Sequence, residues 1–180
     1  MSTNKSMHQN TEPVFNNRPS RRVYDSRNVA VMIVPVFLFE GFPRVPAGKR
    51  SSRVSDSGLW SLPCGYMDWD ESGHEAAIRE AWEEVGLDLR GKVSEQPWHV
   101  QSAPGDDARQ NIVLQFGCIS IVDELPDLRP DGVEVTSACW LKIWDLNPLT
   151  TAFRHAAIAA DYWAYLLDHE IGDRVKISGQ

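Results

Sequence analysis

One segment near the middle of the chain, residues 65–87, restricts the fold and activity of this protein more than any other. It reads GYMDWDESGHEAAIREAWEEVGL and follows a spaced pattern of glycine, glutamate and arginine with two apolar positions. Such a match arises by chance, in a chain of 180 residues, with a probability on the order of one in ten million. The fixed positions are Gly65, Glu71, Arg79, Glu80, Glu83, Glu84 and Gly86.

The middle of this segment predicts one helix with defined ends. Ser72 and Glu75 have the spacing of a capping box, so the helix should begin after Ser72. Gly86 can adopt the left-handed conformation that commonly ends a helix. At about 100° per residue, the apolar residues should share one arc and three glutamates the opposite side. The apolar arc holds Ala77, Ile78, Ala81, Trp82 and Val85, and the acidic face holds Glu80, Glu83 and Glu84.

Three carboxylates on one helix face favour a bound cation. Like charges three or four residues apart repel, and each resists ionisation beside its neighbours. Oxygen ligands without accompanying His or Cys are typical of Mg²⁺ or Mn²⁺ sites. Arg79, at the edge of the face, can pair with Glu75 or Glu83 one turn away, and Glu71 in the preceding loop is a third candidate partner. The alternative, a merely solvated acidic helix, gives no reason for Gly65 and Glu71 at their fixed offsets.

Length and charge narrow the class of protein. A chain of 180 residues with 42% apolar content can bury one sizeable core and leaves little room for a second domain. The net charge of −7 argues against a nucleic-acid duplex as partner, since no long Lys/Arg stripe is present to displace counterions. The negative charge of a phosphate-rich ligand would therefore be balanced locally, and bound metal ions carry the largest local positive charge.

The sequence predicts a cytoplasmic protein without a membrane role. Residues 1–20 are rich in Ser, Asn, Thr and Gln and lack the apolar stretch of a secretory signal. The longest apolar run, residues 29–39, is interrupted by Pro35 and is too short to span a bilayer, so it is interpreted as a buried strand. Three widely spaced cysteines without a CxxC pair are expected to be reduced thiols.

The expected elements alternate between strands and helices. Strands are expected at 29–39, 44–50, 60–63, within 87–101, at 111–122 and at 139–143, turns at 41–43 and 103–108, and a second helix from 151 to about 169. This order predicts a mixed sheet between helices.

The spaced pattern of residues 65–87 resembles the signature of the Nudix hydrolase superfamily. The resemblance implies an α/β/α sandwich with a mixed sheet, in which the motif forms a loop, a helix and a second loop. It implies a domain over residues 27–170, with an N-terminal tail, residues 1–26, and a C-terminal tail, residues 171–180, outside it. The polar composition of the N-terminal tail predicts that it is disordered. It also implies a hydrolase that uses Mg²⁺ or Mn²⁺ and takes small-molecule nucleotide diphosphates.

The resemblance assigns roles within the motif. Glu80 and Glu84 match the principal metal ligands of the family, with Glu83 assisting, and Arg79 holds the acids in place. The residue before the motif glycine often gives its backbone carbonyl to the metal, and here that residue is Cys64, where glycine is commoner. Its side chain would narrow the loop or make it sensitive to oxidation, whereas a buried structural thiol is the other interpretation.

Many family members bring a further glutamate from a loop before the last strand, as a metal ligand or a base. Glu134 is the best match here, with Asp131 and Glu124 as weaker rivals, and an ordinary surface glutamate is the alternative. Hydrolysis of a phosphoric anhydride needs an aligned water and a neutralised leaving phosphate. The proton of that water would pass to Glu83, Glu80 or Glu134, and the sequence does not choose among them.

The substrate is less constrained than the reaction. The motif is shared by enzymes of ADP-ribose, NADH and other dinucleotides, sugar nucleotides, dinucleoside polyphosphates and nucleoside triphosphates. Residues 96–98, Gln-Pro-Trp, are similar to part of the SQPWPFP stretch of NADH pyrophosphatases, although the rest of that stretch and the four-Cys zinc ribbon are missing. Trp98 would stack on a base or belong to the core, and Trp69, inside the motif loop, has the better claim to contact substrate. Arg50 would reach phosphates or remain a solvated loop cation.

Two other function classes are compatible with the fold. A nucleotide-sensing module, as in transcription regulators with a Nudix-like domain, binds without cleaving, but such modules usually lose the acids and add a helix-turn-helix. Isopentenyl diphosphate isomerases share the fold but need a further catalytic cysteine and a modified motif. The apolar residues around Trp163 are compatible with a homodimer interface and equally with core packing.

Overall fold

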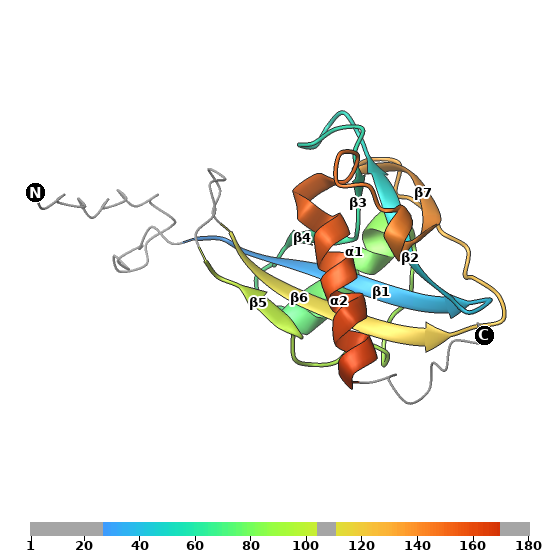
Figure 1. Cartoon of the computed structure of the whole chain (residues 1–180). Coiled ribbons are helices and arrows are strands. Elements are labelled where there is room, and N and C mark those ends of the chain that lie inside the picture. Colours follow the sequence, from blue (N-terminus) through green and yellow to red (C-terminus); the bar gives the residue numbers. More distant parts are fainter. Residues whose placement is uncertain (1–26, 104–110, 170–180) are drawn as a thin grey trace, which may run out of the picture.

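The computed structural model describes residues 27–103 and 111–169 (Figure 1). The expected tails, residues 1–26 and 171–180, and most of the turn at 103–108 lie outside these ranges. In chain order the described elements are β1 (Val29–Phe39), β2 (Phe42–Arg50), β3 (Trp60–Ser61), β4 (Cys64–Tyr66), α1 (Gly73–Val85), β5 (His99–Gln101), β6 (Ile112–Ile121), β7 (Val135–Lys142), the 3-10 helices η1 (Ile143–Asp145) and η2 (Ala152–Arg154), and α2 (His155–His169). No helix in the described ranges is both long enough and apolar enough to cross a bilayer.

The sheet is mixed and is organised around β1. Its main path runs β3-β2-β1-β6-β5, with β4 added to β1 and β7 added to β2. β1 and β6 run parallel along their whole length, whereas β1 pairs antiparallel with β4 near its start and with β2 near its end. Two strands therefore share one edge of β1. β4, which carries the motif glycine, lies beside the first half of β1, and β2 lies beside its end.

Pro35 lies inside β1 without interrupting it. The N–H of Ile33 donates to the carbonyl of Pro63 on the β4 side of the strand, so the missing N–H of Pro35, two residues on, belongs to the same edge. Pairing with β4 ends at Met32 and pairing with β2 begins at Phe37. The proline therefore occupies the gap between two partner strands, where no ladder hydrogen bond is lost.

Alternate side chains of β1 build a core on each face of the sheet. The α1 side takes Val31, Ile33 and Phe37, and the α2 side takes Met32, Val34 and Val36. Figure 1 shows α2 crossing one face of the sheet while α1 lies behind the other. The α/β/α sandwich with a mixed sheet is therefore confirmed.

Helix α1 begins and ends where the sequence predicts. The hydroxyl of Ser72 accepts from the backbone N–H of Glu75, and the carboxylate of Glu75 accepts from the backbone N–H of Ser72 at 2.8 Å, which completes the capping box. Gly86 ends the helix in the left-handed region, at φ 73°. These two ends fix the rotation of the acidic face relative to the sheet.

The apolar arc expected on α1 is wrong in part. The helix buries Glu80 and Glu84 together with its alanines, and it leaves Trp82 57% exposed. The physical reason is that α1 packs against β4 as well as against β1, so its buried surface extends beyond the apolar stripe and takes in part of the acidic face. Two carboxylates consequently lie inside the protein.

Several other boundaries differ from the expected ones. The last strand, expected at 139–143, begins at Val135 and ends at Lys142, because β7 pairs with β2 from Arg44 to Arg50. The second helix begins at His155 rather than near 151, after a turn in which Phe153 and Arg154 both have positive φ. Residues other than glycine rarely adopt positive φ. These two lie at the end of η2 and change the direction of the chain before α2 begins.

Candidate active site

The motif glycine is needed for space. Gly65 lies in β4, paired with Val31 of β1, directly against the side chain of Glu80. A Cβ at position 65 would stand 2.1 Å from Oε1 of Glu80, closer than any non-bonded contact allows. The absent side chain therefore makes the room into which the buried carboxylate of α1 extends.

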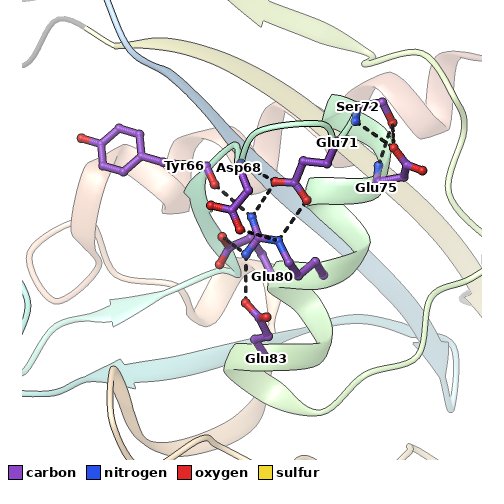
Figure 2. Close-up of polar contacts among 8 residues, drawn as sticks. Tyr66, Asp68, Glu71, Ser72, Glu75, Glu80 and Glu83 are labelled. Atoms are coloured by element: carbon purple, nitrogen blue, oxygen red, sulfur yellow. Dashed lines mark hydrogen bonds and ion pairs between the residues drawn. The ribbon is translucent and has the colours of Figure 1, made fainter. Parts of the chain in front are cut away.

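Arg79 gathers the acidic residues of the motif. Its Nη1 donates to Glu80 at 2.8 Å and to Glu83 at 2.9 Å, while Nε and Nη2 donate to Glu71 at 3.0 and 2.8 Å. Figure 2 shows the carboxylates of Glu71, Glu80 and Glu83 turned toward the same point from the loop and from the helix. The predicted pairings with Glu71 and Glu83 are confirmed, whereas Glu75 is engaged in the helix cap instead. One guanidinium thus holds three carboxylates.

Glu71 fastens the motif loop to the helix. It accepts two hydrogen bonds from Arg79 and one from the backbone N–H of Asp68, at 2.6 Å. The hydrogen bond from Arg79 lowers the pKa of Glu71, so the carboxylate stays charged at neutral pH. Arg79 also donates to the carbonyl of Tyr66 at 3.0 Å. The loop is therefore clamped at three points, which accounts for the fixed offset between Glu71 and Arg79.

Glu84 is a buried carboxyl group with an unusual protonation state. It is 4% exposed, and its Oε2 accepts from the backbone N–H of Cys64 at 3.2 Å. Burial, followed by the charge of Glu80, raises the pKa of Glu84 to about 8. Burial likewise raises the pKa of Glu80, against the opposing effect of Arg79. Two neighbouring acids thus resist ionisation together, which is the situation that a bound cation relieves.

The thiol of Cys64 resists ionisation. Burial and the nearby charge of Glu84 raise the pKa of the Cys64 thiol well above its usual value. Because the thiolate is the reactive form, this shift of the pKa lowers the reactivity of the Cys64 side chain. The backbone of Cys64 meets the acidic site through the N–H that donates to Glu84.

Glu134 lies on the same side of the molecule as the acidic pair. It immediately precedes β7, whose first residue, Val135, pairs with Arg50 at the end of β2. Its negative charge contributes to the raised pKa values of Glu80 and Glu84. Asp131 accepts from the backbone N–H of Glu134 at 3.1 Å and so shapes this loop. The structure therefore brings Glu134 toward the site and gives Asp131 a role in the turn.

Arg50 is largely buried and is therefore not a solvated loop cation. It is 9% exposed, its Nε donates to the carbonyl of Ser55 at 2.7 Å, and its guanidinium lies 4.7 Å from the centre of the Phe153 ring. Its positive charge acts against the raised pKa of Glu84 and of Cys64. A buried cation beside the acidic pair is well placed to meet an anionic group.

The two tryptophans singled out for substrate lie in different surroundings. Trp69 is 95% exposed in the motif loop and borders a surface hollow with Tyr66. Trp98 packs on the α2 side of the sheet, with its ring centre 5.2 Å from that of Tyr162 and 5.7 Å from that of Tyr165. The structure places Trp69 in the loop whose neighbouring residue, Asp68, donates to Glu71, and it places Trp98 away from that loop, against α2.

Comparison with known proteins decides the family. The NUDIX domain model matches residues 26–162, which include every element described except the end of α2. The chain belongs to the Nudix hydrolase superfamily. Among curated relatives, the NAD-capped RNA hydrolase NPY1 of Saccharomyces cerevisiae is 31% identical over 99 residues, covering 51% of this chain and 23% of that protein. The RNA pyrophosphohydrolase of Gluconacetobacter diazotrophicus is 33% identical over 84 residues, covering 43% of this chain and 47% of that protein.

These curated relatives are longer than the matched segment, which spans less than half of either one. Among solved structures, the NUDIX domain of Shewanella oneidensis NrtR complexed with ADP ribose aligns with a TM-score of 0.66 at 19% identity, covering 79% of this chain and 90% of that chain. At that identity the likeness shows the fold alone. It agrees with the sheet and helix arrangement of Figure 1.

His155 is a residue of this Nudix fold that sequence reasoning missed. It is 3% exposed, and its Nδ1 accepts from the backbone N–H of Leu62 at 3.1 Å. Burial, with a smaller effect of the Arg50 charge, lowers the pKa of His155 to about 3, so the ring remains a neutral acceptor. The bond ties α2 to the β3–β4 connection that leads into Cys64. No local spacing reveals a contact between residues 93 positions apart.

The Nudix acids fit a hard divalent cation by the chemistry of their donor atoms. In the present side-chain arrangement, no three His, Cys, Asp or Glu side chains of the described ranges converge closely enough to hold an ion. Glu80 and Glu83 are hydrogen-bonded to Arg79. Glu80 and Glu84 are nevertheless neighbouring buried carboxyl groups with raised pKa values, and the carboxylate of Glu80 fills the space that a side chain at Gly65 would take. Oxygen donors of this kind suit Mg²⁺ or Mn²⁺.

Proposed function

We propose that this protein is a divalent-cation-dependent hydrolase of phosphoric anhydride bonds, acting on a nucleoside diphosphate linked to another moiety. The observation that carries the proposal is the pair of buried carboxyl groups, Glu80 and Glu84, beside Gly65. Burying two acids side by side is costly unless their charge is compensated. Family membership supports the same reaction class, and relatives are named for NAD-capped RNA and for RNA pyrophosphate hydrolysis.

In this proposal Glu80 and Glu84 hold Mg²⁺ or Mn²⁺, with Glu83 and the backbone of Cys64 assisting. When bound, the cation neutralises charge on the phosphates and lowers the pKa of a bound water. Arg79 keeps the acids in position and balances part of their charge. The Glu83 side chain in its ion pair with Arg79 is half-exposed. Because exposed ion pairs contribute little free energy, Glu83 can leave Arg79 for a bound cation at little cost.

The proton of the attacking water needs an acceptor near the phosphates. Glu83 has a side chain that is 55% exposed, and Glu134 lies in an exposed loop on the same side of the molecule. Both can receive a proton without being removed from solvent. Arg50, held by Ser55 and Phe153, would meet a phosphate of the substrate.

The proposal extends to the setting of the protein. It places the active domain at residues 27–170, in the cytoplasm, with a small-molecule nucleotide as partner and no duplex nucleic acid. ADP-ribose, NADH and sugar nucleotides are the substrate classes to compare first. A homodimer through the apolar surface around Trp163 is part of the same proposal.

Hydrolysis is tested with purified protein and a panel of dinucleotides, ADP-ribose, sugar nucleotides and a short NAD-capped RNA, assayed with Mg²⁺ or Mn²⁺ and again with a chelator. We expect one or two compounds to be cleaved, the chelator to stop cleavage, and Glu83→Gln to lower the rate by about a hundredfold or more. Asp161→Asn, an exposed acid on α2, serves as the matched control and should retain the rate.

Two results would contradict the proposed hydrolase activity, and a third would contradict its dependence on a cation. Binding of nucleotides by the folded protein without cleavage of any panel member would favour a sensing module. Conversion of a diphosphate without release of a phosphate product would favour an isomerase. Cleavage that persists in the presence of the chelator would remove the cation from the mechanism.

A further inference from the structure

A surface hollow of about 440 Å³ lies beside the motif loop. Its volume falls within the range of small-molecule sites. The hollow is formed where the start of β1 meets the segment that follows β4. It is lined by Asn28, Val29, Tyr66, Met67, Asp68, Trp69 and Asp70.

The lining combines exposed aromatic rings with negative charge. Trp69 is 95% exposed and Tyr66 is 47% exposed, although the described core buries most other large apolar side chains. Tyr66 is held in place because its hydroxyl accepts from the side-chain amide of Asn111 at 3.2 Å. Asp68 and Asp70 flank Trp69 in sequence and also line the hollow, whereas no Lys or Arg does so among the described residues. The surface therefore offers aromatic faces and carboxylates to a ligand, and no cation.

The hollow shares its wall with the acidic site. The carbonyl of Tyr66 accepts from Nη2 of Arg79 at 3.0 Å, and the N–H of Asp68 donates to Glu71 at 2.6 Å. The carboxylate of Asp68 also lies 3.9 Å from Nε of Arg79. In Figure 2 the ring of Tyr66 points away from the carboxylates of Glu71 and Glu80 while its backbone stays with them. The ring of Tyr66 thus lies on one side of this short loop, and Glu71 lies on the other with Glu80 of α1.

We propose that this hollow is a subsite for a positively charged aromatic base, such as a pyridinium or an N7-alkylated purine, of the substrate whose diphosphate lies at the acids. The assignment rests on the hydrolase proposed above. A cation over an aromatic face is attracted by the ring quadrupole, and quaternary nitrogen compounds are recognised by aromatic residues in this way. Asp70 adds a full negative charge, whereas the charge of Asp68 is partly balanced by Arg79. A neutral base would gain stacking alone.

Equilibrium binding of mononucleotides tests the subsite without requiring any cleavage. We would measure dissociation constants for 7-methyl-GMP against GMP, and for oxidised against reduced nicotinamide mononucleotide, which lack an anhydride bond. The two members of each pair have nearly the same shape, and they differ in the charge on the ring. We expect the charged member to bind about threefold to tenfold more tightly to the unaltered protein.

Three variants distinguish binding of the charged base at this hollow from a general attraction of positively charged ligands to an acidic protein. Trp69→Ala should remove the preference for the charged base, and Asp70→Asn should reduce it. Trp144→Ala replaces another exposed tryptophan, on η1, and should keep it. Because Trp69 is almost fully exposed, its replacement is not expected to unfold the protein.

The outcomes are distinct from those of the hydrolysis assay. Equal affinities within each pair, binding of neither member, or a preference that survives Trp69→Ala would overturn the subsite even if hydrolysis is found. Loss of the preference in Trp69→Ala would support the subsite even if the panel shows no cleavage. Once a cleaved substrate is known, Trp69→Ala should raise KM and change kcat little if the ring is bound equally in the ground and transition states.

Discussion

Glu84→Gln is expected to lower the hydrolysis rate by at least about a thousandfold while leaving the metal-free protein folded and more stable at alkaline pH. The amide oxygen of glutamine can still accept from the N–H of Cys64, which is bonded to Glu84 at 3.2 Å. The negative charge proposed to hold the cation is lost. A thousandfold loss corresponds to about 4 kcal/mol of transition-state stabilisation.

The gain in stability follows from the protonation of Glu84. Its pKa is about 8 in the folded, metal-free protein against an ordinary value of 4.5. Between these values the folded state binds a proton that the unfolded state has released, so the free energy of unfolding falls as pH rises through about 8. The loss between pH 6 and pH 9 is on the order of 2 kcal/mol. A neutral glutamine carries no such loss.

Thermal or denaturant unfolding at pH 6 and pH 9, in chelator, measures this difference. Glu84→Gln should be the more stable of the two at both pH values, and its advantage should grow by roughly 2 kcal/mol between pH 6 and pH 9. Added Mg²⁺ should stabilise the unaltered protein and have little effect on the variant. A variant less stable than the unaltered protein at both pH values would show that Glu84 is charged and well compensated without a cation.

Gly65→Ala is expected to remove about 99% of the activity at a modest cost in stability, about 1 to 2 kcal/mol. The new Cβ would stand 2.1 Å from Oε1, 2.4 Å from Cδ and 2.7 Å from Oε2 of Glu80. The backbone at Gly65 is not left-handed, so strain arises from this clash and not from φ. Glu80 must rotate away, which breaks its 2.8 Å hydrogen bond with Arg79 and displaces a carboxylate from the site.

A second glycine substitution provides the matched control. Gly117 in β6 faces α2, and a Cβ there would stand 2.2 Å from the ring of Tyr162. Gly117→Ala should therefore destabilise the protein by about 1 to 3 kcal/mol and keep the turnover per folded molecule. Measured kcat/KM and unfolding free energies for both variants check the contrast. Full activity in folded Gly65→Ala would contradict the placement of Glu80 in the site.

Local signals in the sequence were sufficient to predict the frame of the site. The capping box at Ser72 and the left-handed stop at Gly86 depend on neighbouring residues alone, and both appear in the structure. The partners of Arg79 four and eight residues away, Glu83 and Glu71, could also be predicted, since they lie on the same helix or in the loop before it. These features needed no knowledge of the sheet.

Features that depend on tertiary packing were not predictable in this way. The burial of Glu84 and the exposure of Trp82 follow from β4 packing on α1, which a helical wheel does not include. The bond between His155 and Leu62 joins elements that only the folded sheet brings together. The placement of Trp98 on the α2 side depends on the packing of the residue just before β5 against Tyr162 and Tyr165 of α2. In each case a distant element decides the environment of the side chain.

The central claim is that a divalent cation replaces a proton on the buried acids. Calorimetric titration of metal-free protein with Mn²⁺ at pH 7, in two buffers of different ionisation enthalpy, counts the protons released per cation bound. Because the pKa of Glu84 is about 8, the unaltered protein should release roughly one proton on binding, and Glu84→Gln should bind weakly with much less release. Tight binding without proton release, or unchanged binding in Glu84→Gln, would contradict the account.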